Sequence, residues 1–261
     1  MARSTFYYQL KKSRKKDKHE ELRQEINRIY HLHKGRYGYR RIGLQLRKNG
    51  YPVNHKTVFM LMNELGLKSI IRVKKYRSYR GEQGKIAPNL LKRDFKALQP
   101  NQKWATDVTE FKVRDRKLYL SPIIDLFNGE IISHTITESP NAKQVLDMIS
   151  QCKRKKKEQE VILHSDQGWQ YQMPVYQLAL KTKNIVPSMS RKGNCLDNAI
   201  IENFFGTLKS ELYYLRNYHS VQELKKDIAE YIHYYNNERI RLNLNGMSPT
   251  EYRAHSLNSL S

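Results

Sequence analysis

The sequence predicts an α/β fold, a mixed β-sheet with flanking helices, which is preceded by an all-α region. Residues 101–261 open with three closely spaced strand-like runs, after which helices and strands alternate. This order places helices on the faces of a mixed sheet. Residues 18–66 show only helical periodicity. A chain of 261 residues with 39% hydrophobic content is long and apolar enough for two small domains.

Three helices are predicted in the N-terminal region. Residues 18–34 carry Leu22, Ile26 and Ile29 or Tyr30 at helical spacing. A second helix, closed by Gly50, carries Ile42, Leu44 and Leu46. Asn54 is a good N-cap for a third helix, which ends at Gly66. The apolar residues of this third helix, which we expect to form its stripe, are Val58, Phe59, Leu61, Met62 and Leu65.

Charge is concentrated in the first 100 residues. They carry 26 Lys or Arg against 7 acids, whereas residues 101–261 carry 22 against 18, within a net charge of +23. Such a cationic region is typical of a nucleic-acid binder. Two short helices joined by a tight turn fit a helix-turn-helix whose second helix enters the major groove. The expected DNA-contacting residues of residues 1–100 are Arg40, Arg41, His55, Lys56, Thr57, Lys74, Lys75 and Arg77. The alternative is a helical bundle whose basic residues are merely solvated.

We divide the chain into a helical helix-turn-helix region (1–67), a basic linker (68–100) and a core with C-terminal helices (101–261). The linker lacks periodicity and is rich in positive charge, so we expect it to follow phosphates. Its Tyr76 and Tyr79 are either stacking platforms for bases or plain exposed side chains. No stretch approaches the 18 apolar residues of a membrane span, and no signal peptide opens the chain. The two cysteines have no paired spacing, which argues against a disulfide framework or a zinc site.

The core is predicted to contain eight elements in order. They are strands at 103–113, 117–125 and 130–137, a helix at 141–152, a strand at 161–165, a helix at 171–183, a strand at 185–189 and a final helix that bears Glu202.

Three acids in the core occupy settings that favour metal ligation. Asp107 lies in the strand-like run WATDVTEF, where an acid is normally depleted. Asp166 follows the strand VILHS at a strand-to-loop edge, where ligand-binding groups concentrate. Glu202 borders the apolar stripe of a predicted helix. The rival acids Asp125 and Asp197 are interpreted as a turn former and a helix N-cap.

Carboxylates of this kind suit a hard cation. Mg²⁺ prefers carboxylate oxygen and water, and two such ions activate an attacking oxygen and stabilise a leaving oxygen at a phosphodiester. Taken singly, each acid has a plain alternative, because an Asp that ends a strand is usually a turn former and a helical Glu is usually solvated. Neither a P-loop nor a dinucleotide fingerprint is present, so no nucleotide cofactor is expected.

Four ordered motifs together resemble a known family. WATDVTEF, HSDQGWQY and DNAIIENFFGTLKSE, with 35 residues between Asp166 and Glu202, resemble the DD(35)E core of retroviral integrases and insertion-sequence transposases. The match is closer to the second-reading-frame transposase of the insertion-sequence-three group. HKGRYGYRRIGLQLRKNGYPVNHKTVFMLMNELGL resembles its helix-turn-helix, and YYNNERIRLNLNGMSPTEYR its C-terminal signature.

This resemblance implies a ribonuclease H-like fold in which the first and fourth strands are neighbours. It implies a transposase that cuts DNA at element ends and joins the 3′-hydroxyl to target DNA, using two Mg²⁺ or Mn²⁺ ions held by Asp107, Asp166 and Glu202. Lys209, two turns after Glu202, would neutralise a phosphate of the bound end. It further implies a homo-oligomer on DNA and an upstream-reading-frame product as a candidate partner. The expected location is the bacterial cytoplasm, on the nucleoid and not at a membrane. Alternatives are a phage or retroelement integrase, or a DNA-binding repressor with an inactive core.

Overall fold

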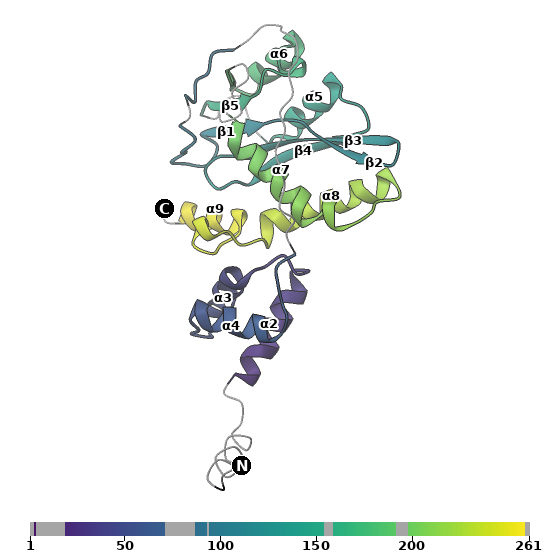
Figure 1. Cartoon of the computed structure of the whole chain (residues 1–261). Helices are drawn as coiled ribbons and strands as arrows, with labels where there is room; N and C mark the ends of the chain where they lie inside the picture. The colour runs from purple at the N-terminus through teal and green to yellow at the C-terminus, as the bar shows by residue number, and fades with distance from the viewer. Residues whose placement is uncertain are drawn as a thin grey trace. The chain divides into compact units, whose positions relative to one another are not determined.

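The computed structural model divides the chain into two compact units, Met1–Ile71 and Arg72–Ser261 (Figure 1). It describes residue 3 and residues 19–70, 87–92, 94–153, 159–191 and 198–258. Within the described residues, no helix is long and apolar enough to cross a membrane.

Residues 19–70 of the N-terminal unit form three helices around a small apolar core. They are α2 (Glu20–Leu32), α3 (Tyr39–Lys48) and α4 (His55–Glu64). Each helix contributes residues that are fully buried, namely Ile26 and Ile29, Ile42 and Leu46, and Val58 and Leu61. The predicted helices are therefore confirmed, and the α3–α4 pair joined by a short turn has the order of a helix-turn-helix.

The boundaries of α4 follow from its sequence. The Asn54 side chain accepts a hydrogen bond of 2.9 Å from the Lys56 N–H, which confirms the predicted N-cap. Gly66 follows the helix with φ of +67°, a left-handed conformation that favours glycine. The predicted apolar stripe is only partly correct, because Phe59 and Leu65 are exposed. Phe59 lies about 100° from Val58 around the helix axis, and this rotation carries it off the buried face.

The C-terminal unit is built on a six-stranded mixed sheet. The strands are β1 (Lys103–Thr106), β2 (Thr109–Val113), β3 (Arg116–Asp125), β4 (Ile131–Thr137), β5 (Val161–Ser165) and β6 (Ile185–Met189). The long strand β3 pairs with β4 along one edge and with β2 and β1 along the other. β1 then pairs in parallel with β5, and β5 with β6. The first and fourth of the predicted strands are thus neighbours, as the ribonuclease H-like fold requires.

The predicted strand 103–113 is interrupted at Asp107 and Val108. The register continues across the break, since Thr106 pairs with Ile123 and Thr109 with Leu120. Asp107 therefore lies opposite Pro122, which has no N–H to donate to the ladder. We infer that this proline ends β1 and frees the backbone around Asp107 from the sheet.

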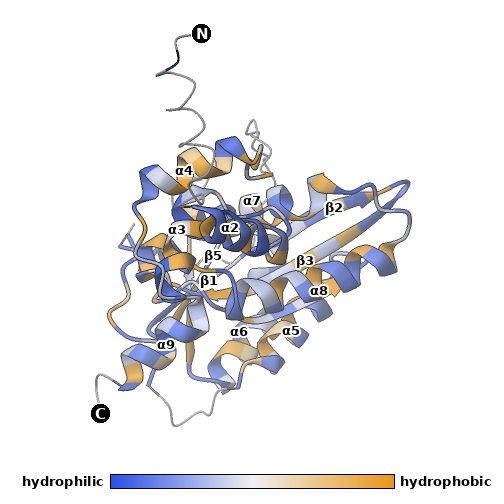
Figure 2. Cartoon of the chain, turned by 90° about the horizontal axis from the view of Figure 1, so that it is seen from below, coloured by the Kyte–Doolittle hydropathy of each residue, from blue (hydrophilic) through white to orange (hydrophobic). Residues whose placement is uncertain are grey.

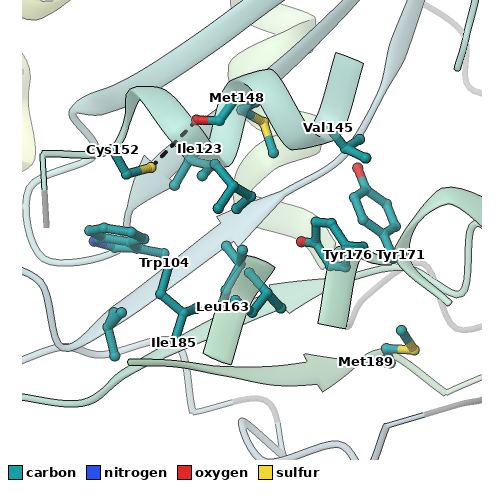
Figure 3. Close-up of a cluster of buried hydrophobic side chains, with 13 residues drawn as sticks. Trp104, Ile123, Val145, Met148, Cys152, Leu163, Tyr171, Tyr176, Ile185 and Met189 are labelled. Carbon is teal, nitrogen blue, oxygen red and sulfur yellow. Dashed lines mark hydrogen bonds between the residues drawn. The ribbon is translucent and has the colours of Figure 1, made fainter. Parts of the chain in front are cut away.

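Helices cover both faces of the sheet. On one face, α5 (Ala142–Gln151) and α6 (Pro174–Thr182) enclose an apolar cluster that includes Trp104, Met148 and Leu163 (Figure 3). On the other face, α7 (Ala199–Glu211) crosses β1, and α8 (Val221–Asn237) packs on β3 and β4 (Figure 1). The helix α9 (Pro249–Asn258) packs on α8. Short 3₁₀ turns lie at Trp169–Tyr171, Tyr213–Leu215 and Leu242–Leu244.

Part of the segment interpreted as a linker packs on this unit. The Leu90 N–H donates to the Ser188 hydroxyl at 2.9 Å, and Leu91 is buried. Lys103 forms an ion pair of 2.8 Å with Asp94. The described residues after 86 therefore belong to the sheet domain. Residues 71–86, which include Lys74, Lys75, Tyr76, Arg77 and Tyr79, lie outside the described residues.

Candidate active site

Two neighbouring parallel strands deliver Asp107 and Asp166 to the same edge of the sheet. β1 pairs with β5 in a fixed register, in which Ala105 is the partner of His164. Two residues further along each strand stand Asp107 and Asp166, immediately beyond the ends of β1 and β5. Because side chains alternate along a strand, the two carboxylates lie at matching positions on the same side of the sheet.

Local backbone bonds fix one oxygen of each carboxylate. Asp107 Oδ1 accepts the Val108 N–H at 2.7 Å, and Asp166 Oδ1 accepts the Gly168 N–H at 2.9 Å. A Cβ at position 168 would approach the side chains of Gln170 and Asp166 to 2.6 and 2.9 Å, so a larger residue there would displace the Asp166 carboxylate or Gln170. In the part of the chain that the structure describes, nothing bonds to the Oδ2 atom of either aspartate. One oxygen of each therefore remains available to a ligand.

Glu202 approaches this pair from the face of the sheet that α7 covers. It lies in the first turn of α7, a helix that contacts β1 and is anchored by buried Ile201, Phe204 and Leu208. Glu202 itself is partly exposed. The segment 192–197 before the helix, which contains Cys195 and Asp197, lies outside the described residues, and Asn198 occupies the N-cap position.

The pKa values reflect the crowding of like charges. Burial, followed by the negative charges of Asp166 and Glu202, holds the pKa of Asp107 well above its ordinary value. The Val108 N–H and the Lys209 ammonium oppose this shift. Burial also raises the pKa of Asp166, against the bond from Gly168. In the protein alone, this edge therefore disfavours negative charge on carboxylates that a bound cation would stabilise.

Lys209 reaches the same edge from α7. Its Nζ donates to the Thr109 hydroxyl at 2.7 Å and lies 5.0 Å from the centre of the Phe111 ring. Because Lys209 is seven residues after Glu202, the two side chains share a face of the helix. The site thus combines three acids with one cation at its border.

The donor set fits a hard divalent ion that brings its own water and phosphate ligands. Carboxylate oxygens are the ligands that Mg²⁺ prefers, and Mg²⁺ is commonly held by only one or two carboxylates together with substrate phosphates. Among the residues described, no three or more His, Cys, Asp or Glu side chains form a group that could hold a metal ion. Metal binding by these acids would therefore need water and substrate phosphate to complete the ligand shell.

Two buried acids outside this site are bound to arginines. Asp125, a predicted rival, is buried and accepts hydrogen bonds from the Asn101 and Phe127 N–H groups and from Arg253. The Gly129 N–H closes the following turn onto the Asp125 carbonyl, as expected of a turn former. Glu211, at the end of α7, forms a buried two-bond pair with Arg239 and accepts the Tyr231 hydroxyl. Periodicity gave no indication of this second network.

The expected DNA-contacting residues of the N-terminal unit differ in exposure. Arg40, His55 and Lys56 are exposed, whereas Arg41 and Thr57 are partly covered. The Arg41 guanidinium lies 5.7 Å from the centre of the Tyr37 ring. His55, Lys56 and Thr57 form the first turn of α4, the position from which a recognition helix contacts bases.

Known families match both units. The integrase core domain family matches residues 97–195 and, in a second part, 202–257, and an HTH-like domain family matches residues 17–75. The mixed sheet with flanking helices and these matches define a ribonuclease H-like integrase-core enzyme, of the polynucleotidyl-transferase type, with a helix-turn-helix region before it.

Close relatives identify the group. The chain is 57% identical over 96% of its length to a protein of Escherichia coli (strain K12) named as the transposase InsK for insertion sequence element IS150, and it covers 89% of that protein. It is 35% identical to the transposase for IS904 of Lactococcus lactis, covering 94% of this chain and 98% of the relative. It is 33% identical to the transposase InsF for IS3A of Escherichia coli, with 98% and 92% covered. The chain belongs to the IS3 group of DDE-type insertion-sequence transposases.

Solved structures similar to this chain include the catalytic core domain of HTLV-2 integrase in complex with magnesium. That match has a TM-score of 0.49 and 20% identity, and covers 60% of this chain and 98% of the other.

Proposed function

We propose that this transposase cleaves DNA at the ends of an insertion sequence and joins the freed 3′-hydroxyl to target DNA, with Asp107, Asp166 and Glu202 as its catalytic acids. The observation that carries this proposal is the matched position of Asp107 and Asp166 at the ends of two paired parallel strands. Glu202 is close enough to raise the pKa of Asp107. Asp107 and Asp166 form no ion pair with a described residue, in contrast to the buried acids Glu211 and Asp125, which pair with arginines.

Asp107, Asp166 and Glu202 would together hold two Mg²⁺ or Mn²⁺ ions. When bound, such ions activate the attacking oxygen and stabilise the leaving oxygen of the phosphodiester. The chain contributes orientation, since the Val108 and Gly168 N–H groups fix each aspartate through Oδ1 and leave Oδ2 facing the ligand. Lys209, held beside Thr109, would neutralise a phosphate of the bound end.

The N-terminal unit would hold the element ends. Its residues Arg40, Arg41, His55, Lys56 and Thr57 would contact DNA, and the basic residues of 68–100 would add contacts to the phosphate backbone. Joining requires both ends at once, so we propose a homo-oligomer that assembles on DNA. An upstream-reading-frame product is a further candidate partner. The site of action would be the bacterial nucleoid in the cytoplasm.

The decisive variant is Glu202→Gln, which keeps the shape of the side chain and removes the charge that a metal needs. We expect strand transfer to fall at least roughly a thousandfold, because a deficit of several kcal/mol follows when charge stabilisation of the transition state is lost. Stability should change by about 0.5 kcal/mol or less, since Glu202 is partly exposed. The measurement is Mg²⁺-dependent cleavage and joining of labelled end DNA, together with a melting curve and a gel shift.

The matched control is Glu230→Gln, the same chemical change on an exposed face of α8. It should leave joining and DNA binding near wild type. Mg²⁺ should also raise the melting temperature of wild type and of Glu230→Gln more than that of Glu202→Gln, a readout independent of activity. Joining near wild type in Glu202→Gln would remove this residue from the catalytic set, and a collapsed melting temperature would assign it a structural role.

A further inference from the structure

The third helix of the N-terminal unit presents an apolar surface to solvent. Phe59 and Met60 are 51% and 46% exposed. The helix buries Val58, Leu61 and Met62 on one side, so at about 100° per residue the opposite side carries Lys56, Phe59, Met60 and Asn63. All four are exposed. This surface, which we call the α4 outer face, combines two large apolar side chains with an ammonium and an amide. The ribbon of α4 carries both hydrophobic and hydrophilic segments in Figure 2.

Neighbouring aromatic contacts hold one part of the α4 outer face in place. The Tyr39 ring, at the start of α3, meets the Phe59 ring edge to face with 5.2 Å between ring centres. The Arg40 guanidinium lies 5.7 Å from the centre of the Tyr39 ring, and its Nε donates to the Tyr39 hydroxyl at 3.1 Å. Phe59 is therefore packed from the side while half of it stays open to a ligand. A ring ordered in this way loses little conformational entropy when it binds.

The charge around these apolar groups identifies the occupant. Lys56 stands on the same face, and no described residue forms a hydrogen bond or an ion pair with its ammonium. The first 100 residues carry 26 Lys or Arg against 7 acids, which attracts a polyanion and disfavours a second copy of the same surface. The occupant must combine negative charge with accessible methyl groups. Duplex DNA meets this description, because thymine displays its C5-methyl group in the major groove beside the phosphates.

We propose that Phe59 and Met60 determine sequence specificity by packing against thymine C5-methyl groups in the major groove of the element ends. Lys56 would supply a polar or phosphate contact from the same face. This inference rests on the proposed binding of DNA by the N-terminal unit. It adds that the unit recognises bases through apolar contacts as well as polar ones. It also explains why two large apolar residues remain exposed on a short helix of a small domain.

The test removes methyl groups from the DNA. The full chain is used to select its preferred duplex from a randomised pool, and each thymine of that duplex is then replaced singly by deoxyuridine, which lacks only the C5-methyl. We expect one or two thymines at which replacement weakens binding about fourfold each, the equivalent of about 0.8 kcal/mol per buried methyl. Replacement at the other thymines should leave the Kd unchanged.

Two variants assign the effect to residues. Phe59→Ala and Met60→Ala should each bind the thymine duplex about as weakly as wild type binds the corresponding deoxyuridine duplex, and should lose the discrimination at that position. The matched control is Leu32→Ala, which truncates a residue of α2 that is 62% exposed in the same unit. It should keep the full methyl sensitivity. Melting curves establish that the variants remain folded, and Phe59→Leu, which keeps an apolar side chain, should retain part of the discrimination.

The outcomes separate this inference from the function on which it rests. If the chain selects a duplex but no thymine methyl matters, or if both alanine variants keep the wild-type discrimination, the inference is overturned and DNA binding stands. If no duplex is selected, DNA binding by this unit fails and the inference fails with it. If Phe59→Ala alters the oligomeric state in light scattering while methyl sensitivity persists, the α4 outer face is a protein interface and the inference is wrong.

Discussion

The core unit contains two kinds of covered carboxylate, and they have opposite partners. Glu211 and Asp125 each face an arginine at 2.6 Å, from Arg239 and Arg253 respectively. Asp107 and Asp166 form no ion pair within the described chain, and two acids, Asp166 and Glu202, act on the pKa of Asp107 together with the more weakly acting Lys209. The two kinds differ in the group that compensates their negative charge. Arginines neutralise Glu211 and Asp125 within the fold, whereas no described residue forms an ion pair with Asp107 or Asp166.

We propose that this contrast separates structural acids from functional ones. A buried carboxylate without a countercharge is costly, so a fold supplies an arginine unless a ligand takes that place. Burial alone does not distinguish the two kinds, because it raises the pKa of Asp125 as well as that of Asp107. Around Asp125 every neighbouring group lowers the pKa, whereas around Asp107 two acids raise it further and the Val108 N–H and Lys209 only partly oppose them. The charge of the groups around a buried carboxylate therefore distinguishes the two kinds better than burial does.

The largest effect on stability should come from breaking the Glu211–Arg239 pair. Arg239→Met leaves Glu211 buried beside the Tyr231 hydroxyl without the positive charge of the arginine, so we expect a loss of about 3–5 kcal/mol in the free energy of unfolding. The measurement is urea denaturation of the full chain. If Glu211, Tyr231 and Arg239 are replaced together by Leu, Phe and Met, most of this loss should be recovered, because no uncompensated charge remains. A small loss in Arg239→Met would place Glu211 with the functional acids and break the comparison.

Asp107→Asn should act in the opposite direction. Without metal at neutral pH, the variant should be about 0.5–2 kcal/mol more stable than wild type, since it removes a charge that burial and like neighbours disfavour. It should also be inactive in strand transfer. Mg²⁺ should stabilise wild type and not the variant, so the difference in melting temperature should shrink as Mg²⁺ is added.

The pH dependence of that difference has a definite sign. The folded-state pKa of Asp107 is raised, so the folded chain keeps its proton at pH values where the unfolded chain has lost it. The free energy of unfolding of the metal-free wild type should therefore rise relative to that of Asp107→Asn as the pH falls from neutral toward about 4, the ordinary pKa range of Asp. A stability difference that stays constant over this pH range would mean that folding does not raise the pKa of Asp107.

Much of this architecture was predictable from local sequence patterns. The N-cap at Asn54 and the strand at 161–165 are confirmed to the residue, because capping and apolar runs are local signals. The break at Asp107 was not predicted, since its cause is Pro122, a residue on the partner strand. The exposure of Phe59 was not predicted, because spacing alone does not distinguish an apolar residue beside the buried face of α4 from one that belongs to that face.

In the candidate site, too, some features could be predicted from local sequence patterns and others are seen only in the folded structure. Asp107 and Asp166 were predicted from their settings at strand edges, and their matched positions follow from the β1–β5 register, which local patterns do not contain. The Glu211–Arg239 pair spans 28 residues and has no periodic signal. The restriction on residue size at Gly168 depends on the approach of the Gln170 and Asp166 side chains, which only the folded turn reveals.

The smallest expected effect concerns an ion pair in the N-terminal unit whose N···O distance is close to that of Glu211–Arg239. Arg23 on α2 contacts Glu64 on α4 at 2.7 Å, close to the 2.6 Å of Arg239 and Glu211, but the Arg23 and Glu64 side chains are 25% and 45% exposed instead of 7% and 2%. Water solvates the exposed charges in both folded and unfolded states, so little is gained by pairing them and little is lost when one is removed. A double-mutant cycle with Arg23→Met and Glu64→Gln should give a coupling of about 0.2–1 kcal/mol that decreases in 1 M salt. The same cycle on Arg239 and Glu211 should give a much larger coupling that salt changes little. Equal couplings would show that distance, and not burial, sets the strength of these ion pairs.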